Sequence, residues 1–311
     1  MHKLFRIFLV LLLFISAALK AQEADSLLNS IDQSSYKGAS LSTFKDTRIV
    51  LSHSSETQKA HALDMRIRHH FGDIGGEFGS SHTLYGLDIA TDLYIGFDYG
   101  VTDRLTIGVG RSKSNELYNL FVKQKAIQQK AGSSPVTLTL LAQGGWITRE
   151  ERQANEFNSD STRGSYLLQA MVSRRFSDRL SLQVTPSYLI RSEFIELGDE
   201  QNLFSLGFAG RLKLKKRLSL VADYQLVNSF GRSKSFAKDK YFNPLGVGLE
   251  IETGGHVFSL NFMNAEHIIE NNFIHDTQKS WNNGGMRFGF VIARNFQIGK
   301  SKNPDIESKI Y

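Results

Sequence analysis

Apolar residues recur at every second position along most of this sequence, from Leu63 onward. In the segment 93–99 the apolar residues stand at odd positions, and Gly96 and Asp98 stand between them. Because side chains alternate between the two faces of a β-strand, this period predicts strands with one apolar face and one small or charged face. We expect an all-β chain of about twelve strands, which begin near residues 63, 92, 105, 116, 135, 165, 180, 203, 218, 244, 256 and 285.

Short turns and long connections alternate between these segments. Arg104, Arg179 and Arg217 each lie in a variant of one tight turn, and Gly132 and Gly254 mark two more. A transmembrane β-barrel has this arrangement, with short periplasmic turns and longer outer loops. The expected fold is therefore an antiparallel up-and-down transmembrane β-barrel. Its longer, polar connections are 72–90, 112–116, 148–164, 192–202, 227–243 and 264–284.

A secreted soluble β-sandwich is the competing fold, because its strands also alternate. Three features favour the barrel. The segments of about nine to eleven residues suit a bilayer, whereas strands of globular proteins average five or six. The polar face carries charges that a dry sandwich core would not accept. Aromatic residues lie near the segment ends, as interfacial girdles require; they are Phe71, Tyr99, Trp146, Phe176, Tyr188, Tyr224, Trp281 and Phe296.

The first residues have the order of a secretory signal peptide. Lys3 and Arg6 precede an almost wholly apolar run from Ile7 to Leu19, and the small residue Ala21 follows. This order predicts export and cleavage near Ala21. The apolar run is shorter than the roughly 20 residues that a spanning helix needs, so an uncleaved anchor is the less favoured alternative. The expected location is the outer membrane of a Gram-negative bacterium.

Charge and cysteine content exclude several classes of function. The formal net charge of +6 includes three basic leader residues and no leader acid. Without the leader, 34 basic residues stand against 31 acidic ones, or +3, so we expect no nucleic-acid partner. The absence of cysteine excludes disulfides, thiolate metal sites and cysteine nucleophiles. We divide the chain into a signal peptide (1–21), a periplasmic extension or lumen plug (22–60), the barrel (61–298) and a polar tail (299–311).

Several stretches resemble a family of outer-membrane β-barrel proteins of Gram-negative bacteria that is catalogued only as a domain of unknown function. The resemblance runs from about Ser40 to Phe296 and is most specific in the turns. It implies the barrel fold and the outer membrane, and it supplies no catalytic residue and no cofactor. The residues that carry it are Phe44-Lys-Asp-Thr-Arg-Ile49, 85–91, 100–111, 175–184, 251–258 and 280–290.

Three groups of residues invite a chemical interpretation that their spacing does not support. His69 and His70 are adjacent on a strand, so they point to opposite faces and cannot chelate one metal ion together. His256 and Ser259 are an odd number of residues apart, so with Asn261 they form no local hydrolase triad. Glycines near 108–110 and 253–255 lack the strand–loop–helix frame of a phosphate loop. We therefore expect no metal, no cofactor and no enzyme activity.

Charged residues on the polar face are the remaining candidates for a site. They could form a salt-bridge lattice that locks the barrel, or line a narrow channel whose charges select solutes. Glycines on the same face are expected to leave space, and residues 23–60 could fill it as a plug, so an open and a plugged lumen both remain. The candidate residues are Asp64, Arg66, Arg68, Asp98, Arg211, Lys213, Asp223, Glu250, Glu252 and Arg287.

Passage or binding of small polar solutes through this charged lumen is the function that we expect. One alternative is a non-conducting structural or adhesion barrel whose loops 148–164, 227–243 and 264–284 bind partners. Basic residues in 112–130 and 227–243, Arg232 among them, could hold lipopolysaccharide headgroups beside the surrounding outer-membrane lipid. A lipid-modifying barrel enzyme is the second alternative.

Overall fold

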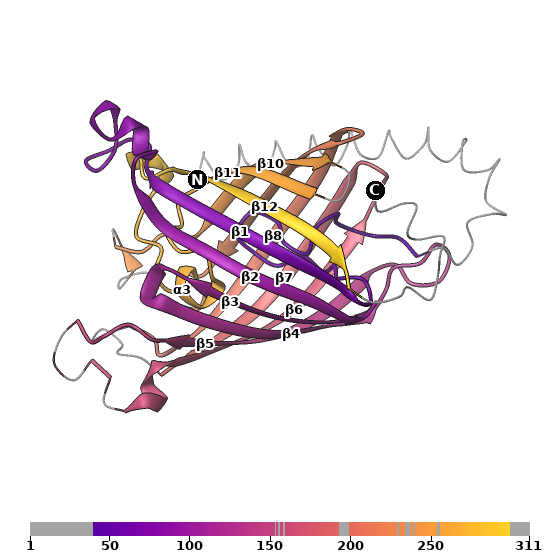
Figure 1. The fold of residues 1–311 in the computed structure, drawn as a ribbon, viewed down its shortest axis with the longest axis horizontal. Coiled ribbons are helices and arrows are strands. Elements are labelled where there is room, and N and C mark those ends of the chain that lie inside the picture. The colour runs from indigo at the N-terminus through magenta and orange to yellow at the C-terminus, as the bar shows by residue number, and fades with distance from the viewer. Residues whose placement is uncertain are drawn as a thin grey trace.

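A computed structural model describes residues 40–298, apart from 153, 155, 158, 193–198, 229, 234–236, 239 and 254–255. The predicted signal peptide and C-terminal tail lie outside the described residues. Within them, each strand hydrogen-bonds to its neighbours in antiparallel order, and β1 pairs with both β2 and β12, which closes the barrel (Figure 1). The predicted all-β barrel is confirmed. Its strands are β1 (Ala62–Asp73), β2 (Ala90–Thr102), β3 (Leu105–Ser112), β4 (Leu117–Ile127), β5 (Thr137–Ile147), β6 (Gly164–Arg175), β7 (Leu180–Arg191), β8 (Asn202–Lys215), β9 (Leu218–Leu226), β10 (Leu245–Thr253), β11 (His256–Met263) and β12 (Arg287–Gln297).

The two faces of each strand differ as the alternation requires. Along β4, Leu120 and Val122 are exposed on the outside. Phe121 and Lys123, which alternate with them, are buried in the interior. A belt of outward apolar side chains suits contact with lipid, and closure satisfies backbone groups that lipid cannot hydrogen-bond. No helix among the described residues is long and apolar enough to cross a membrane.

The two ends of the barrel are unequal. The short connections, such as the one from β2 to β3, lie at the end where Ala62 of β1 pairs with Gln297 of β12; we name it the turn end. The long connections lie at the opposite, loop end, on the left in Figure 1, with short 3-10 helices at Ser81–Gly86, Ser114–Glu116, Asp160–Arg163 and Trp281–Asn283.

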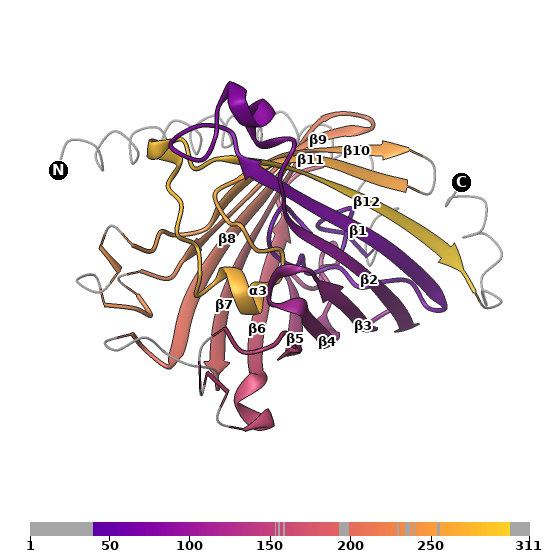
Figure 2. The ribbon, with the colours of Figure 1, turned by 60° about the vertical axis from the view of Figure 1, so that its left-hand side comes forward.

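Two segments enter the barrel. Residues 40–60, the N-terminal segment, lie in the lumen before β1 begins (Figure 2). Residues 264–277, the inner loop segment, fold inward from the loop end and carry the short helix α3 (Glu270–Phe273), whose four residues are all buried. Phe44 and Leu51 of the first segment and Phe273 of the second belong to one buried apolar cluster with wall leucines.

Other groups of the protein fill the space beside the glycines on the inner face. A Cβ atom at Gly96 or Gly110 would lie 2.2 Å from the hydroxyl oxygen of Tyr94. A Cβ atom at Gly246 would lie 2.6 Å from Cγ1 of Val50 in the N-terminal segment. Neighbouring side chains and the N-terminal segment therefore occupy the space that these glycines leave, as in the plugged alternative.

Candidate functional site

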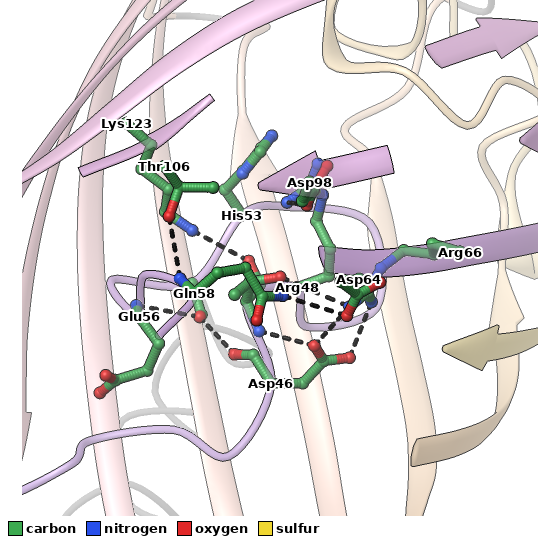
Figure 3. Close-up of polar contacts among 12 residues, drawn as sticks. Asp46, Arg48, His53, Glu56, Gln58, Asp64, Arg66, Asp98, Thr106 and Lys123 are labelled. Carbon is green, nitrogen blue, oxygen red and sulfur yellow. Dashed lines mark hydrogen bonds and ion pairs between the residues drawn. The ribbon is translucent and has the colours of Figure 1, made fainter. Parts of the chain in front are cut away.

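A buried charge cluster joins β1 to the N-terminal segment (Figure 3). Asp64 and Arg66 are two residues apart on β1, so both face the lumen. Arg66 donates two hydrogen bonds to the carboxylate of Asp46, at 2.7 and 2.6 Å, and a third to Asp64 at 3.0 Å. Gln58 donates to the same Asp64 oxygen at 3.0 Å. A forked guanidinium matched to a carboxylate is among the strongest polar contacts in proteins.

Further ion pairs link the same segment to other strands. Arg48 lies 3.2 Å from Asp98 of β2, and both side chains are buried. Lys125 of β4 donates to Glu56 at 2.7 Å. Lys123, also on β4, donates to the carbonyl oxygen of Thr47. The N-terminal segment therefore supplies counter-charges that the wall of the barrel does not.

Asp223 and Arg68 bind backbone groups of the N-terminal segment and not its charged side chains. One carboxylate oxygen of Asp223 accepts the N–H groups of residues 50, 51 and 52, at 3.3, 2.9 and 2.9 Å. Arg68 donates to the carbonyl oxygens of Val50 at 2.8 Å and Leu51 at 3.3 Å. These wall groups thus satisfy both the donors and the acceptors of a tight turn in the lumen.

The remaining predicted charges lie nearer the two ends. Arg211 bridges Glu250 at 2.9 Å and Glu252 at 2.8 Å. Arg287 lies 2.7 Å from Asp73 and 3.3 Å from Glu266. Among the described residues no ion pair includes Lys213, and Arg68 and Asp223 bond only to backbone groups.

The inner loop segment has its own anchors. Asp92 of β2 accepts a hydrogen bond from the N–H of Ile268 at 2.8 Å and from Ser112 and Ser114. Glu270 accepts from the N–H of His53 at 3.2 Å. Because His53 belongs to the N-terminal segment, the two inward segments meet directly inside the barrel.

His267 connects the inner loop segment to Ser114, in the β3–β4 connection at the loop end. Its Nδ1 lies 2.6 Å from the hydroxyl of Ser114, and its Nε2 lies 3.0 Å from the carboxylate of Asp276. Burial opposes the charged imidazole, but the hydrogen bond and charge of Asp276 outweigh it and raise the pKa of His267 above its usual 6.5. Burial likewise opposes ionisation of Asp276, and the bond from His267 overcomes it and lowers the pKa of that carboxyl.

The sequence identified the wall charges but missed their partners. Asp46, Arg48 and Glu56 precede the first strand, where period two gives no signal. The stretch 44–49, however, was the first that carried the family resemblance. Lys123 and Lys125 were detectable, since they alternate with the outward residues of β4.

Two further expectations concern residues outside the charge cluster. His256 lies on the outer face beside Phe258, while Ser259 is buried inside and donates to Asn261, so the three residues form no triad. Arg232, expected among the basic loop residues available to lipopolysaccharide, is instead buried against Asp199 at 2.7 Å. That part of the expectation is wrong, because folding uses this charge internally. The described part of the chain contains no cluster of three or more His, Cys, Asp or Glu residues that could hold a metal ion.

The closed sheet with an apolar outside and a charged, occupied inside defines a membrane-bound β-barrel. The family model described as a membrane bound beta barrel domain (DUF5777) matches residues 44–296. The chain belongs to this family, which confirms the resemblance seen in the sequence. No curated protein is detectably similar to it in sequence.

Solved structures with a similar fold are outer-membrane proteins. An outer membrane channel from Pseudomonas putida F1 has a TM-score of 0.47 and 12% identity, over 78% of this chain and 98% of that chain. The NanC porin has a TM-score of 0.43 and 8% identity, over 75% of this chain and 98% of its own. The KdgM porin has a TM-score of 0.43 and 7% identity, over 76% and 98%.

Proposed function

We propose that this barrel lies in the outer membrane of a Gram-negative bacterium and lets small polar solutes pass through its lumen. In the resting state the N-terminal segment and the inner loop segment close that path. The polar character of the contacts between the N-terminal segment and the wall carries the proposal. Arg66, Asp98 and Lys125 hold the segment through charges, and Asp223 holds it through backbone N–H groups.

Such contacts suit a plug that leaves and returns. A buried ion pair contributes little net stability compared with apolar packing of the same volume, because both ions lose their hydration. Once the segment withdraws, Arg66 and Asp98 would face water, in which both charges are well solvated. An apolar wall would instead collapse or bind lipid. The ten lumen charges named from the sequence would then line the path and bias it between solutes of different charge.

A reversible cross-link tests this proposal, because the chain has no cysteine of its own. The hydroxyl oxygens of Ser55 and Ser173 lie 2.5 Å apart, on the N-terminal segment and β6 respectively. The variant Ser55→Cys/Ser173→Cys should therefore form a disulfide that fixes the segment to the wall. Single-channel conductance in planar bilayers is the measurement, and each single cysteine variant is the matched control.

We expect the reduced double variant to show channel openings. These openings should disappear on oxidation and return when reductant is added. The single variants should be indifferent to the redox state. Silence of the wild type, of the reduced double variant and of a variant that lacks residues 40–60 would contradict passage. That outcome would favour a barrel that does not conduct.

A further inference from the structure

Along part of β6 to β9, the lumen wall carries a band of uncharged polar side chains. Gln169 of β6, Ser187 of β7, Ser205 of β8 and Gln225 of β9 all face inward and are at most 4% exposed. Gln169 pairs in register with Ser187, and Ser187 pairs with Ser205. Gly207, two residues after Ser205, pairs with Gln225. These four side chains therefore form one continuous band, which we name the neutral arc.

Three polar atoms of the neutral arc have no hydrogen-bond partner in the protein. They are the amide oxygens of Gln169 and Gln225 and the hydroxyl of Ser205. The amide nitrogens are engaged, since Gln169 donates to Ser187 at 3.0 Å and Gln225 donates to Ser52 at 3.1 Å. A buried polar atom without a partner costs free energy, so these atoms require water or a ligand. Two of the three are acceptors only, and they require a ligand that donates.

An apolar layer adjoins the arc on the side of the loop end. Leu167, Leu189 and Leu203 lie two residues nearer the loop end than the arc residues of β6, β7 and β8. Leu189 pairs in register with both Leu167 and Leu203. They pack with Phe273 of the inner loop segment in one buried cluster. On the other side of the arc, Gln183 holds the carbonyl oxygen of His53. The arc thus lies between the two segments that close the barrel.

The chemistry of this region favours ligands that donate hydrogen bonds over anions. Asp223 is the nearest lumen charge along β9; one of its carboxylate oxygens accepts three N–H groups of the N-terminal segment, and the other has no partner among the described residues. No described arginine or lysine contacts the unpaired atoms of the arc. An anion brings acceptors to a site that needs donors, and the four side chains of the arc include no carboxylate that could pair with a cation. Hydroxyl groups donate without charge, and the C–H faces of a sugar ring match a leucine layer.

We propose that the neutral arc is a binding site for neutral, hydroxyl-rich solutes, namely sugars, on their way through the barrel. This inference rests on the proposed passage function and specifies its substrate class. A sugar hydroxyl would donate to the amide oxygens of Gln169 and Gln225, which accept no hydrogen bond from the described part of the protein. The lumen charges and the amide nitrogen of Gln225 hold the N-terminal segment, and the oxygens of the arc that have no partner recognise the sugar.

Three solutes of one size test the inference, namely glucose, glucosamine and glucuronate. Swelling of liposomes that contain the full mature chain should be fastest with glucose. The variant Gln169→Leu/Ser205→Ala should reduce the glucose rate by about tenfold, because each lost hydrogen bond is worth a few-fold in affinity. Ser219→Ala is the matched control, since Ser219 is also a buried inward serine with an unpaired hydroxyl, and it lies outside the arc.

Saturation-transfer NMR of glucose with the detergent-solubilised chain reports binding separately from passage. The signal should be present in the wild type and in Ser219→Ala and should fall in the double variant. Equal swelling rates for the three solutes, with equal NMR signals in all variants, would overturn the sugar site while leaving the channel intact. A variant-sensitive NMR signal without swelling would support the site and refute passage.

Discussion

Arg66 and Arg175 are two arginines of the same barrel in opposite surroundings. Arg66 is 1% exposed between two carboxylates, whereas Arg175 pairs with Asp178, which is 94% exposed. Arg66 has two carboxylate partners and Arg175 has one, and only the partners of Arg66 are largely buried. A charge pair in water loses little when it is broken, but a buried one leaves its partners without compensation.

Arg66→Ala should therefore destabilise the barrel strongly. The change leaves Asp46 and Asp64 buried without their shared cation, and we expect the free energy of unfolding to fall by about 3–5 kcal/mol. Urea unfolding in phospholipid vesicles measures this change. Arg175→Ala is the control and should show no measurable shift; an equal loss in both variants would mean that Arg66 is not buried as described.

His267 should make the anchoring of the inner loop segment depend on pH. Its pKa is raised in the folded chain, so the extra stability is complete below the usual value of 6.5 and is lost as the pH rises through the raised pKa. Amide hydrogen exchange of residues 264–277 should therefore accelerate on the alkaline side, after correction for intrinsic rates. In His267→Gln this dependence should vanish; a persistent dependence would assign it to another group.

At the scale of elements, the strands were predictable from the sequence and the paths of the two inward segments were not. Strands β3, β7, β9 and β11 begin at the predicted residues, because alternation and turn composition are local properties. The inward path of 264–277 was not predicted, since a long connection was expected to remain outside. Its apolar residues Ile268, Ile269, Phe273 and Ile274 carried the missed signal, because four such residues do not suit an exposed loop.

The carboxylate of Asp92 should decide whether the inner loop segment stays in the lumen. Both of its oxygens accept hydrogen bonds, including the one from Ile268. Asp92→Asn replaces one acceptor with a donor that faces other donors, which costs about 1–3 kcal/mol per unsatisfied group. We expect faster hydrogen exchange in 264–277, and no change in the control Asp88→Asn on an exposed loop. Equal protection in both variants would contradict this role.

At the scale of the whole molecule, charged and uncharged side chains occupy different levels of the lumen wall on β6 to β9. Arg211 of β8 pairs with Glu250 and Glu252 nearer the turn end, Arg191 of β7 pairs with Asp199 at the loop end, and the neutral arc lies between these levels. The alternation predicted which residues face inward, Lys213 and Glu252 included, because facing is set by parity along each strand. The pairs with Asp46, Arg48 and Glu56 were not predictable, because they depend on how the N-terminal segment crosses the lumen.

The outer surface should tolerate charge only near its edges. Val122 lies midway along β4 and is 45% exposed on the lipid side. Val122→Arg should lower the free energy of unfolding in vesicles by about 2–4 kcal/mol, and Leu214→Arg, near the turn end of β8, by about 0–1 kcal/mol. Denaturant titration measures both. Equal tolerance at the two positions would contradict the placement of this face in lipid.

The seam between β1 and β12 dictates an order of assembly. Ala62 meets Gln297, so the last ladder to form joins chain regions that synthesis separates most widely. Contacts of such long sequence separation are the slowest to form. Residues 40–60 lead directly into β1, so their path into the lumen starts at one edge of this seam. A barrel that closes before this segment enters would have to thread it in along the route that a withdrawn plug takes to return.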